Sequence, residues 1–130
     1  METVLLPLLL FYYNAIGLGN YDKDLLRDFV IIEARMYGVD PQLASKIVQA
    51  ESGFNNDAIG DTHLKCRTTG KPMRSRGLWQ WNTCGNSHIT DKMAFDPIIS
   101  TNLALEEIKK NGCKKWSNCK EIMKSLLDDS

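Results

Sequence analysis

Two Asp-Pro pairs, at positions 40–41 and 96–97, fix where two helices of this chain begin. Aspartate caps the free N–H groups of a first helical turn, and proline is favoured at the first helical position. The first helix should end near Ser52, before Gly53, and the second near Asn111-Gly112. The apolar residues predicted to line their inner faces are Leu43, Ala44, Ile47, Val48, Ala50 and Phe54, then Ile98, Ile99, Leu105 and Ile108.

Two further segments carry the same helical periodicity. One runs from about Asp22 to Tyr37, with Asp22 as N-cap and Gly38 as terminator. The other begins near Ser117. Their predicted inner faces are Leu25, Phe29, Ile32 and Met36, then Ile122, Met123, Leu126 and Leu127. Because no strand pattern is convincing and 130 residues suit one domain, we predict a mainly α single domain.

The region between the two helices that begin with Asp-Pro lacks sustained periodicity. Residues 55–76 are mostly polar and include Gly60, Gly70 and Pro72, which indicates a long loop or a short hairpin. A loop of this length in a compact domain is usually functional, so we expect it to form one wall of a cleft. The apolar residues 77–81 that follow are predicted to form one or two helical turns.

The N-terminal 19 residues differ from the rest of the chain. An apolar run from Val4 to Tyr13 is followed by small residues, and no charge occurs between Glu2 and Asp22. The run has the length of a secretory signal core and is short for a membrane span, although only the amino terminus is positive. We expect residues 1–19 to be a signal peptide, a membrane anchor or an apolar segment packed on a domain spanning 20–130.

Four cysteines, an even number in a chain expected to be exported, indicate two disulfides. Three pairings can be drawn, of which Cys66–Cys84 with Cys113–Cys119 is the most local. A zinc site is the alternative, because His63, Cys66, Cys84 and His88 have suitable spacings. We favour disulfides, since an oxidising compartment stabilises them, and expect no metal.

The charge balance bears on the partners. Sixteen basic and sixteen acidic residues give a net charge of zero, which argues against nucleic acid as the main partner. Sugars are compatible with this balance because they are bound through hydrogen bonds and aromatic faces. We expect a monomer.

Glu51 is the strongest candidate for chemistry. It lies three and four residues after Val48 and Ile47, so it borders the apolar face of its helix in the last turn. Desolvation and the negative end of the helix dipole both raise a carboxyl pKa. A glutamic acid kept protonated near neutral pH can donate a proton to a glycosidic oxygen. The alternative is a structural glutamate, either at the helix boundary or paired with Lys or Arg.

Three ordered motifs resemble those of soluble lytic transglycosylases. Residues 47–55 (IVQAESGFN), with Val39-Asp40-Pro41 before them, resemble the catalytic helix of that family. Residues 77–80 (GLWQ) are similar to its Gly-Leu-Met-Gln motif, and residues 94–97 (AFDP) followed by Asn102 are similar to its Phe-Asp-Pro…Asn segment. The resemblance implies a lysozyme-like fold of the goose-type superfamily.

The resemblance also implies an activity. Glu51 would act as general acid and base in cleaving the MurNAc-β-1,4-GlcNAc bond of peptidoglycan, with formation of 1,6-anhydro-MurNAc and without a cofactor. The enzyme would then be secreted, periplasmic or otherwise extracytoplasmic, or carried by a virion. Hydrolysis by a lysozyme of the same fold stays open if Asp57 or Asp61 activates water. A glycan-binding module without turnover is the second alternative.

Substrate-binding roles are expected for further residues. Gln80 and Ser75 match polar positions in or beside the family's second motif, and Asn102 lies on an inner helix face. Trp79 could form a sugar platform, although such tryptophans more often belong to the core. Residues 63–74 look like an insertion, and the family's Ala-Tyr-Asn motif is replaced by residues 113–119, where Trp116 could supply an aromatic wall.

Overall fold

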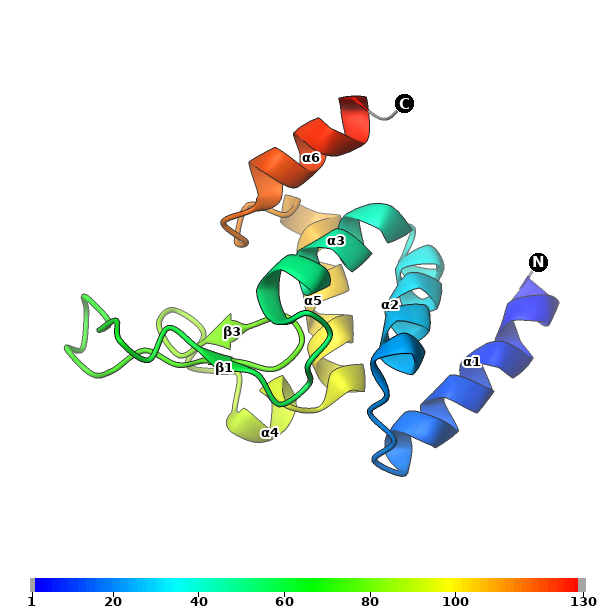
Figure 1. Ribbon diagram of the computed structural model, residues 1–130, viewed down its shortest axis with the longest axis horizontal. Helices are drawn as coiled ribbons and strands as arrows, with labels where there is room; N and C mark the ends of the chain where they lie inside the picture. The colour runs from blue at the N-terminus through cyan, green and yellow to red at the C-terminus, as the bar shows by residue number, and fades with distance from the viewer. Residues whose placement is uncertain (1, 129–130) are drawn as a thin grey trace.

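The computed structural model describes residues 2–128, which form six helices and a small antiparallel sheet (Figure 1). The mainly α class predicted from the sequence is confirmed. The elements are α1 (Glu2–Gly17), α2 (Lys23–Tyr37), α3 (Pro41–Ser52), β1 (Ile59–Gly60), β2 (Ser75–Arg76), β3 (Trp81–Asn82), α4 (Asp91–Ala94), α5 (Pro97–Asn111) and α6 (Cys119–Asp128).

The predicted aspartate caps form as expected. Asp22, Asp40 and Asp96 each accept two backbone N–H groups from the first turn of α2, α3 and α5. Gly38 and Gly53 end α2 and α3 in the left-handed conformation that glycine adopts without steric cost. These caps place the last turn of α3, which carries Glu51, at a defined point.

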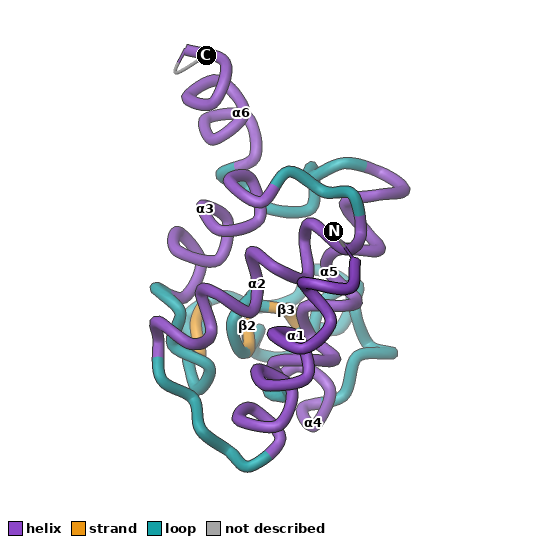
Figure 2. Tube along the Cα trace, turned by 90° about the vertical axis from the view of Figure 1, so that its right-hand side faces the viewer, coloured by secondary structure: helices purple, strands orange, loops and turns teal. Residues whose placement is uncertain are grey.

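The core lies where α2 packs against α3 and α5 (Figure 2). Its fully buried side chains include Leu26, Phe29, Ile47, Val48, Phe54 and Leu105. Three residues predicted to face inward in α2, α3 and α5 do not: Met36, Ala50 and Ile99 are exposed. Each of these helices contacts more than one neighbour. The side that is buried therefore differs from the apolar face predicted from a simple helical repeat.

The short hairpin left open for residues 55–76 forms, and a third strand that no sequence pattern indicated joins it. β1 pairs with β2 and β2 with β3, both antiparallel, with Ser75 opposite Gly60 and Asn82. Residues 77–80 form a turn between β2 and β3, so the predicted helical turns at 77–81 are wrong. Gly77 adopts a positive φ in this turn, which a helix could not accommodate.

A hairpin-like extension of residues 61–74 joins β1 to β2 and projects beyond the sheet (Figure 1). Lys65 and Pro72 form an isolated bridge, and the Cys66 N–H donates to the carbonyl oxygen of Lys71. A disulfide from Cys66 to Cys84 clamps the extension to the loop after β3. The zinc alternative is therefore wrong, because both of its cysteine ligands are oxidised.

α6 begins at Cys119, which forms the second disulfide with Cys113, and packs against α3. The most local pairing is thus the one that forms. Ile122 is buried, but Met123 is 45% and Leu127 71% exposed, which corrects the prediction that both face inward. The helix projects from the body of the domain, as Figure 2 shows, so only one side of it meets α3.

The N-terminal apolar segment is the helix α1, which packs on α2 and α5. Ile16 is buried in the core, and the Tyr13 ring meets the Phe29 ring edge-on at 5.4 Å. Among residues 2–128, no helix combines the length and the apolar character that crossing a membrane requires. Whether residues 1–19 are removed as a signal peptide stays a prediction.

α1 also contributes a polar contact to a buried carboxyl group. Glu33 on α2 is 3% exposed, and burial raises its pKa, while a hydrogen bond with Tyr13 lowers it. When folding raises the pKa of a carboxyl group, the folded state loses stability as the pH rises above the pKa that the group has in the unfolded chain. Tyr13 limits that loss by hydrogen bonding to the charged form.

Replacing Tyr13 with phenylalanine should therefore destabilise the protein mainly at neutral pH. Without the hydroxyl the pKa of Glu33 rises further, so the cost should be about 1 kcal/mol larger at pH ~7 than at pH ~3, where Glu33 is protonated in both states and only the loss of the Asn102 hydrogen bond remains. Urea unfolding at the two pH values measures this difference. The exposed Tyr21→Phe is the matched control, and an equal loss at both pH values would contradict the account.

Candidate active site

A cleft of about 410 Å³ lies between the end of α3, the sheet and the loop before α6. Glu51, Ser75, Gln80 and Trp116, four of the six predicted site residues, line it together. The other lining residues are Asp61, Trp81, Asn82, Cys84, Gly85, Asn86, Lys115 and Ser117.

Glu51 occupies the last turn of α3 and is half-buried. The next residue, Ser52, donates its hydroxyl to the carbonyl oxygen of Leu78 at 2.8 Å, which ties the helix end to the turn between β2 and β3. Phe54, after the left-handed Gly53, is fully buried and carries the Arg27 guanidinium over its ring at 4.7 Å. The carboxyl group is therefore presented from an anchored helix end.

The surroundings of Glu51 favour its neutral form. Burial is the main cause that raises its pKa, and the nearby charge of Asp61 raises it further. Asn118 acts in the opposite direction, because its amide donates to Oε2 of Glu51 at 3.5 Å and stabilises the anion. None of the ion pairs formed within residues 2–128 includes Glu51. The group can therefore hold a proton that it later donates.

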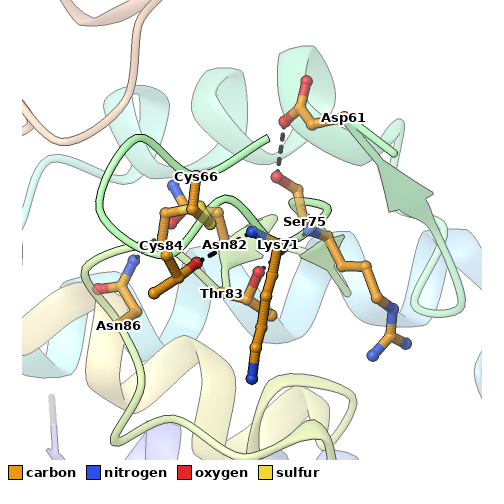
Figure 3. The surroundings of a disulfide bond; sticks show 10 residues. Asp61, Cys66, Lys71, Ser75, Asn82, Thr83, Cys84 and Asn86 are labelled. Atoms are coloured by element: carbon orange, nitrogen blue, oxygen red, sulfur yellow. Dashed lines mark hydrogen bonds between the residues drawn. A yellow bond between two sulfur atoms is a disulfide. The ribbon is translucent and has the colours of Figure 1, made fainter. Parts of the chain in front are cut away.

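Asp61 and Ser75 form a hydrogen-bonded pair beside Glu51. The Ser75 hydroxyl donates to Oδ2 of Asp61 at 2.6 Å, as Figure 3 shows. Asp61 has a φ of +60°, an uncommon backbone conformation that asparagine and aspartate tolerate better than most residues. Asp57, the other aspartate considered from the sequence, is exposed and does not line the cleft.

Gln80 enters the cleft with its amide group oriented by the backbone. Its Nε2 donates to the carbonyl oxygens of Ala58 and Gly77 at 3.1 and 2.9 Å. A Cβ at Gly60 would lie 2.6 Å from Oε1 of Gln80, so glycine at that position makes room for the amide. With both N–H groups engaged, Gln80 presents its oxygen as an acceptor for a hydroxyl or N–H of a ligand.

Three tryptophans pack around the floor of the cleft. The rings of Trp79 and Trp81 each meet Trp116 edge-on, with centroids 5.6 Å apart in both pairs. The Trp116 indole N–H donates to the carbonyl oxygen of Trp79 at 3.0 Å, which joins the loop before α6 to the turn after β2. Trp81 and Trp116 reach the cleft, whereas Trp79 does not.

Two predicted binding residues lie outside the cleft. Trp79 is fully buried, and its indole N–H donates to the Thr101 hydroxyl on α5. Asn102 hydrogen bonds with Tyr13 on the side of α5 that faces α1. Neither residue lines the cleft, because the Trp79 ring is buried against α5 and the Asn102 side chain lies on the side of α5 that meets α1.

The cleft also contains polar residues that the sequence did not single out. Asn82 and Asn86 lie beside the Cys66–Cys84 disulfide (Figure 3), and Lys115 reaches the other side next to Trp116. The position of Asn82 between Trp81 and Cys84 could have indicated that it lies in the cleft. That inference would have required β3 to be recognised as a strand. Asn118 could not be found, since it contacts Glu51 from 67 residues away.

A buried arginine supports this wall of the cleft. Arg76 on β2 is 2% exposed and donates to the carbonyl oxygens of Trp81 and Ile89. It also pairs with Asp91 at 2.9 Å. Hydrogen bonds from Arg74 and then from Arg76 hold the pKa of the Asp91 carboxyl below its usual value. The arginine thus ties the sheet to α4.

Comparison with known proteins is consistent with this site. The transglycosylase SLT domain family model matches residues 28–123, from α2 into α6. No curated protein and no solved structure matched the chain. Enzymes of this family cleave the glycan strands of peptidoglycan, which lies outside the cytoplasm, and two disulfides fit that location. Since the match covers most of the sequence, the chain belongs to the transglycosylase SLT domain family and is a glycan-cleaving enzyme.

Proposed function

We propose that this chain cleaves the MurNAc-β-1,4-GlcNAc bond of peptidoglycan by lytic transglycosylation, with Glu51 as general acid and then general base. The observation that carries the proposal is the half-buried Glu51 carboxyl in the cleft, with a raised pKa and no ion-pair partner among residues 2–128. Gln80, Ser75 and Trp116 are the proposed substrate-binding residues on the walls around it.

The reaction would need only one ionisable group of the protein. Protonated Glu51 donates its proton to the bridging oxygen while the carbonyl oxygen of the MurNAc N-acetyl group attacks the anomeric carbon. The bond between that carbon and the bridging oxygen breaks, and the GlcNAc strand leaves with a free 4-hydroxyl. The Glu51 carboxylate then takes the proton of the 6-hydroxyl, whose oxygen displaces the acetamido oxygen. This restores the N-acetyl group, leaves Glu51 protonated and gives the 1,6-anhydro ring. In this scheme the Gln80 oxygen accepts a hydrogen bond from the substrate, since the amide nitrogen already donates to two backbone carbonyl oxygens.

Hydrolysis remains the second candidate because of Asp61. This carboxylate lines the same cleft and acts electrostatically on Glu51, so it could activate water on the opposite side of the sugar. Its 2.6 Å hydrogen bond with Ser75 favours a positioning role instead, because that bond occupies one of its oxygens. Family membership also favours transglycosylation.

Mass spectrometry of a wall digest separates the two reactions. Transglycosylation predicts products lighter than reducing muropeptides by one water molecule and resistant to borohydride. The Asp61→Asn variant should give the same products, since Asp61 is not the base in this scheme. Reducing ends from the wild-type protein, lost in Asp61→Asn, would instead establish the hydrolytic reaction.

The catalytic unit is proposed to span residues 20–130. The family match starts at residue 28, so α1 lies outside it although it packs on α2 and α5. Either a leader peptide or a membrane anchor in residues 1–19 would be compatible with an enzyme that works outside the cytoplasm.

A further inference from the structure

The extension of residues 61–74 places positively charged side chains beside the cleft. Between Thr62 and Thr90 the chain carries five lysines and arginines and no acidic residue, although the net charge of the whole chain is zero. Arg74 and Arg76 pair with Asp91. The other three, Lys65, Arg67 and Lys71, are exposed, and none of the ion pairs formed within residues 2–128 includes them.

A second hollow of about 490 Å³ lies on this extension and meets the catalytic cleft. Cys84 and Gly85 line both spaces, so the Cys66–Cys84 disulfide stands at their common border. The side chains of Leu64 and Met73 make part of the lining apolar, and Lys65 and Arg67 supply positive charge. A ligand of the cleft could continue past the disulfide into this hollow.

We propose that this second hollow is a subsite for the peptide stem of peptidoglycan. The glycan itself is uncharged at the sugar rings, but each MurNAc carries a short peptide with free carboxylates and alanine methyl groups. Those two features complement a hollow that combines aliphatic side chains with two cations that form no ion pair within residues 2–128. Lys65 and Arg67 are thus specificity-determining residues that recognise the stem while Glu51 acts on the glycan.

The construction of the extension supports recognition by a fixed surface. The disulfide, the Lys65–Pro72 bridge and the hydrogen bond from Met73 N–H to the Leu64 carbonyl oxygen hold the hollow's walls at both ends. A surface held in this way loses little conformational freedom on binding. This inference rests on the proposed function of the neighbouring cleft.

The test compares glycan strands of equal length with their stems intact or removed by an amidase, with the lactyl carboxylate that the amidase exposes capped as an amide. For the wild-type protein kcat/KM should be about tenfold higher on stem-bearing strands, and the preference should shrink as salt is added. In Lys65→Gln/Arg67→Gln the preference should disappear, while cleavage of stem-free strands stays unchanged. The matched control, Lys120→Gln/Lys124→Gln, removes two exposed cations from α6 and should keep the preference.

Three results would overturn the proposal: no stem preference in the wild-type protein, equal loss in both double variants, or an effect confined to whole walls that carry anionic polymers. Binding of the same strands to Glu51→Gln, with and without the two hollow substitutions, gives a readout that does not need turnover. If the wild-type protein cuts nothing but that binding preference is present, the proposed reaction fails and the stem subsite stands.

Discussion

Replacing Glu51 with glutamine is expected to reduce kcat for wall digestion by roughly a thousandfold or more. Glutamine has nearly the same shape but cannot donate a proton to the bridging oxygen or accept one from the 6-hydroxyl. Because the cleft walls are unchanged, the variant should still bind purified peptidoglycan as tightly as the wild-type protein. Turbidity loss measures turnover, and co-sedimentation with insoluble wall measures binding.

The matched control for this variant is Glu121→Gln, which makes the same chemical change on the exposed surface of α6. It should digest wall at the wild-type rate. If Glu51→Gln keeps substantial lysis, Glu51 is not the acid. If the wild-type protein binds wall and never cuts it, the chain has kept the binding cleft without the reaction.

The largest effect on stability is expected from Gly77→Ala. A Cβ at this position would lie 2.2 Å from the carbonyl oxygen of Ala94, which is backbone and cannot rotate away. The φ of +79° adds strain for any L side chain. Together the clash and the strain should cost at least about 3 kcal/mol and lower Tm by roughly 10 °C or more.

Gly70→Ala separates the two causes. Gly70 also has a positive φ, +68°, but nothing lies within 4 Å of the point that a Cβ would occupy, so only backbone strain of about 1 kcal/mol should appear. Thermal unfolding of both variants by circular dichroism makes the comparison. Equal Tm losses would show that close packing of the turn on α4 does not contribute.

Local sequence signals predicted the helices well because their caps are local. An aspartate followed by proline, or a glycine after an apolar face, acts within one turn, and α2, α3 and α5 begin and end where those residues lie. The three two-residue strands carry no such signal. Their surroundings are set by contacts between distant segments: Arg76 joins the sheet to α4, and the Cys66–Cys84 disulfide joins the extension to the loop after β3.

The site shows the same division. Glu51, Gln80 and Ser75 were found because motif and periodicity place them, and they meet in the cleft. Trp79 was misplaced because its position in the motif does not reveal that the ring turns toward Thr101. Asn118 depends on a contact between α3 and the loop before α6 that only the fold creates.

The most direct test of the account is the titration of the Glu51 carboxyl carbon by NMR, with Glu51→Gln used to assign its signal. Burial should hold its pKa above the ordinary value for glutamate. Asp61→Asn should lower that pKa, because it removes a neighbouring negative charge, and Asn118→Ala should raise it, because it removes a hydrogen bond to the anion. A wild-type pKa at or below the ordinary value would contradict the claim that Glu51 carries the proton the reaction needs.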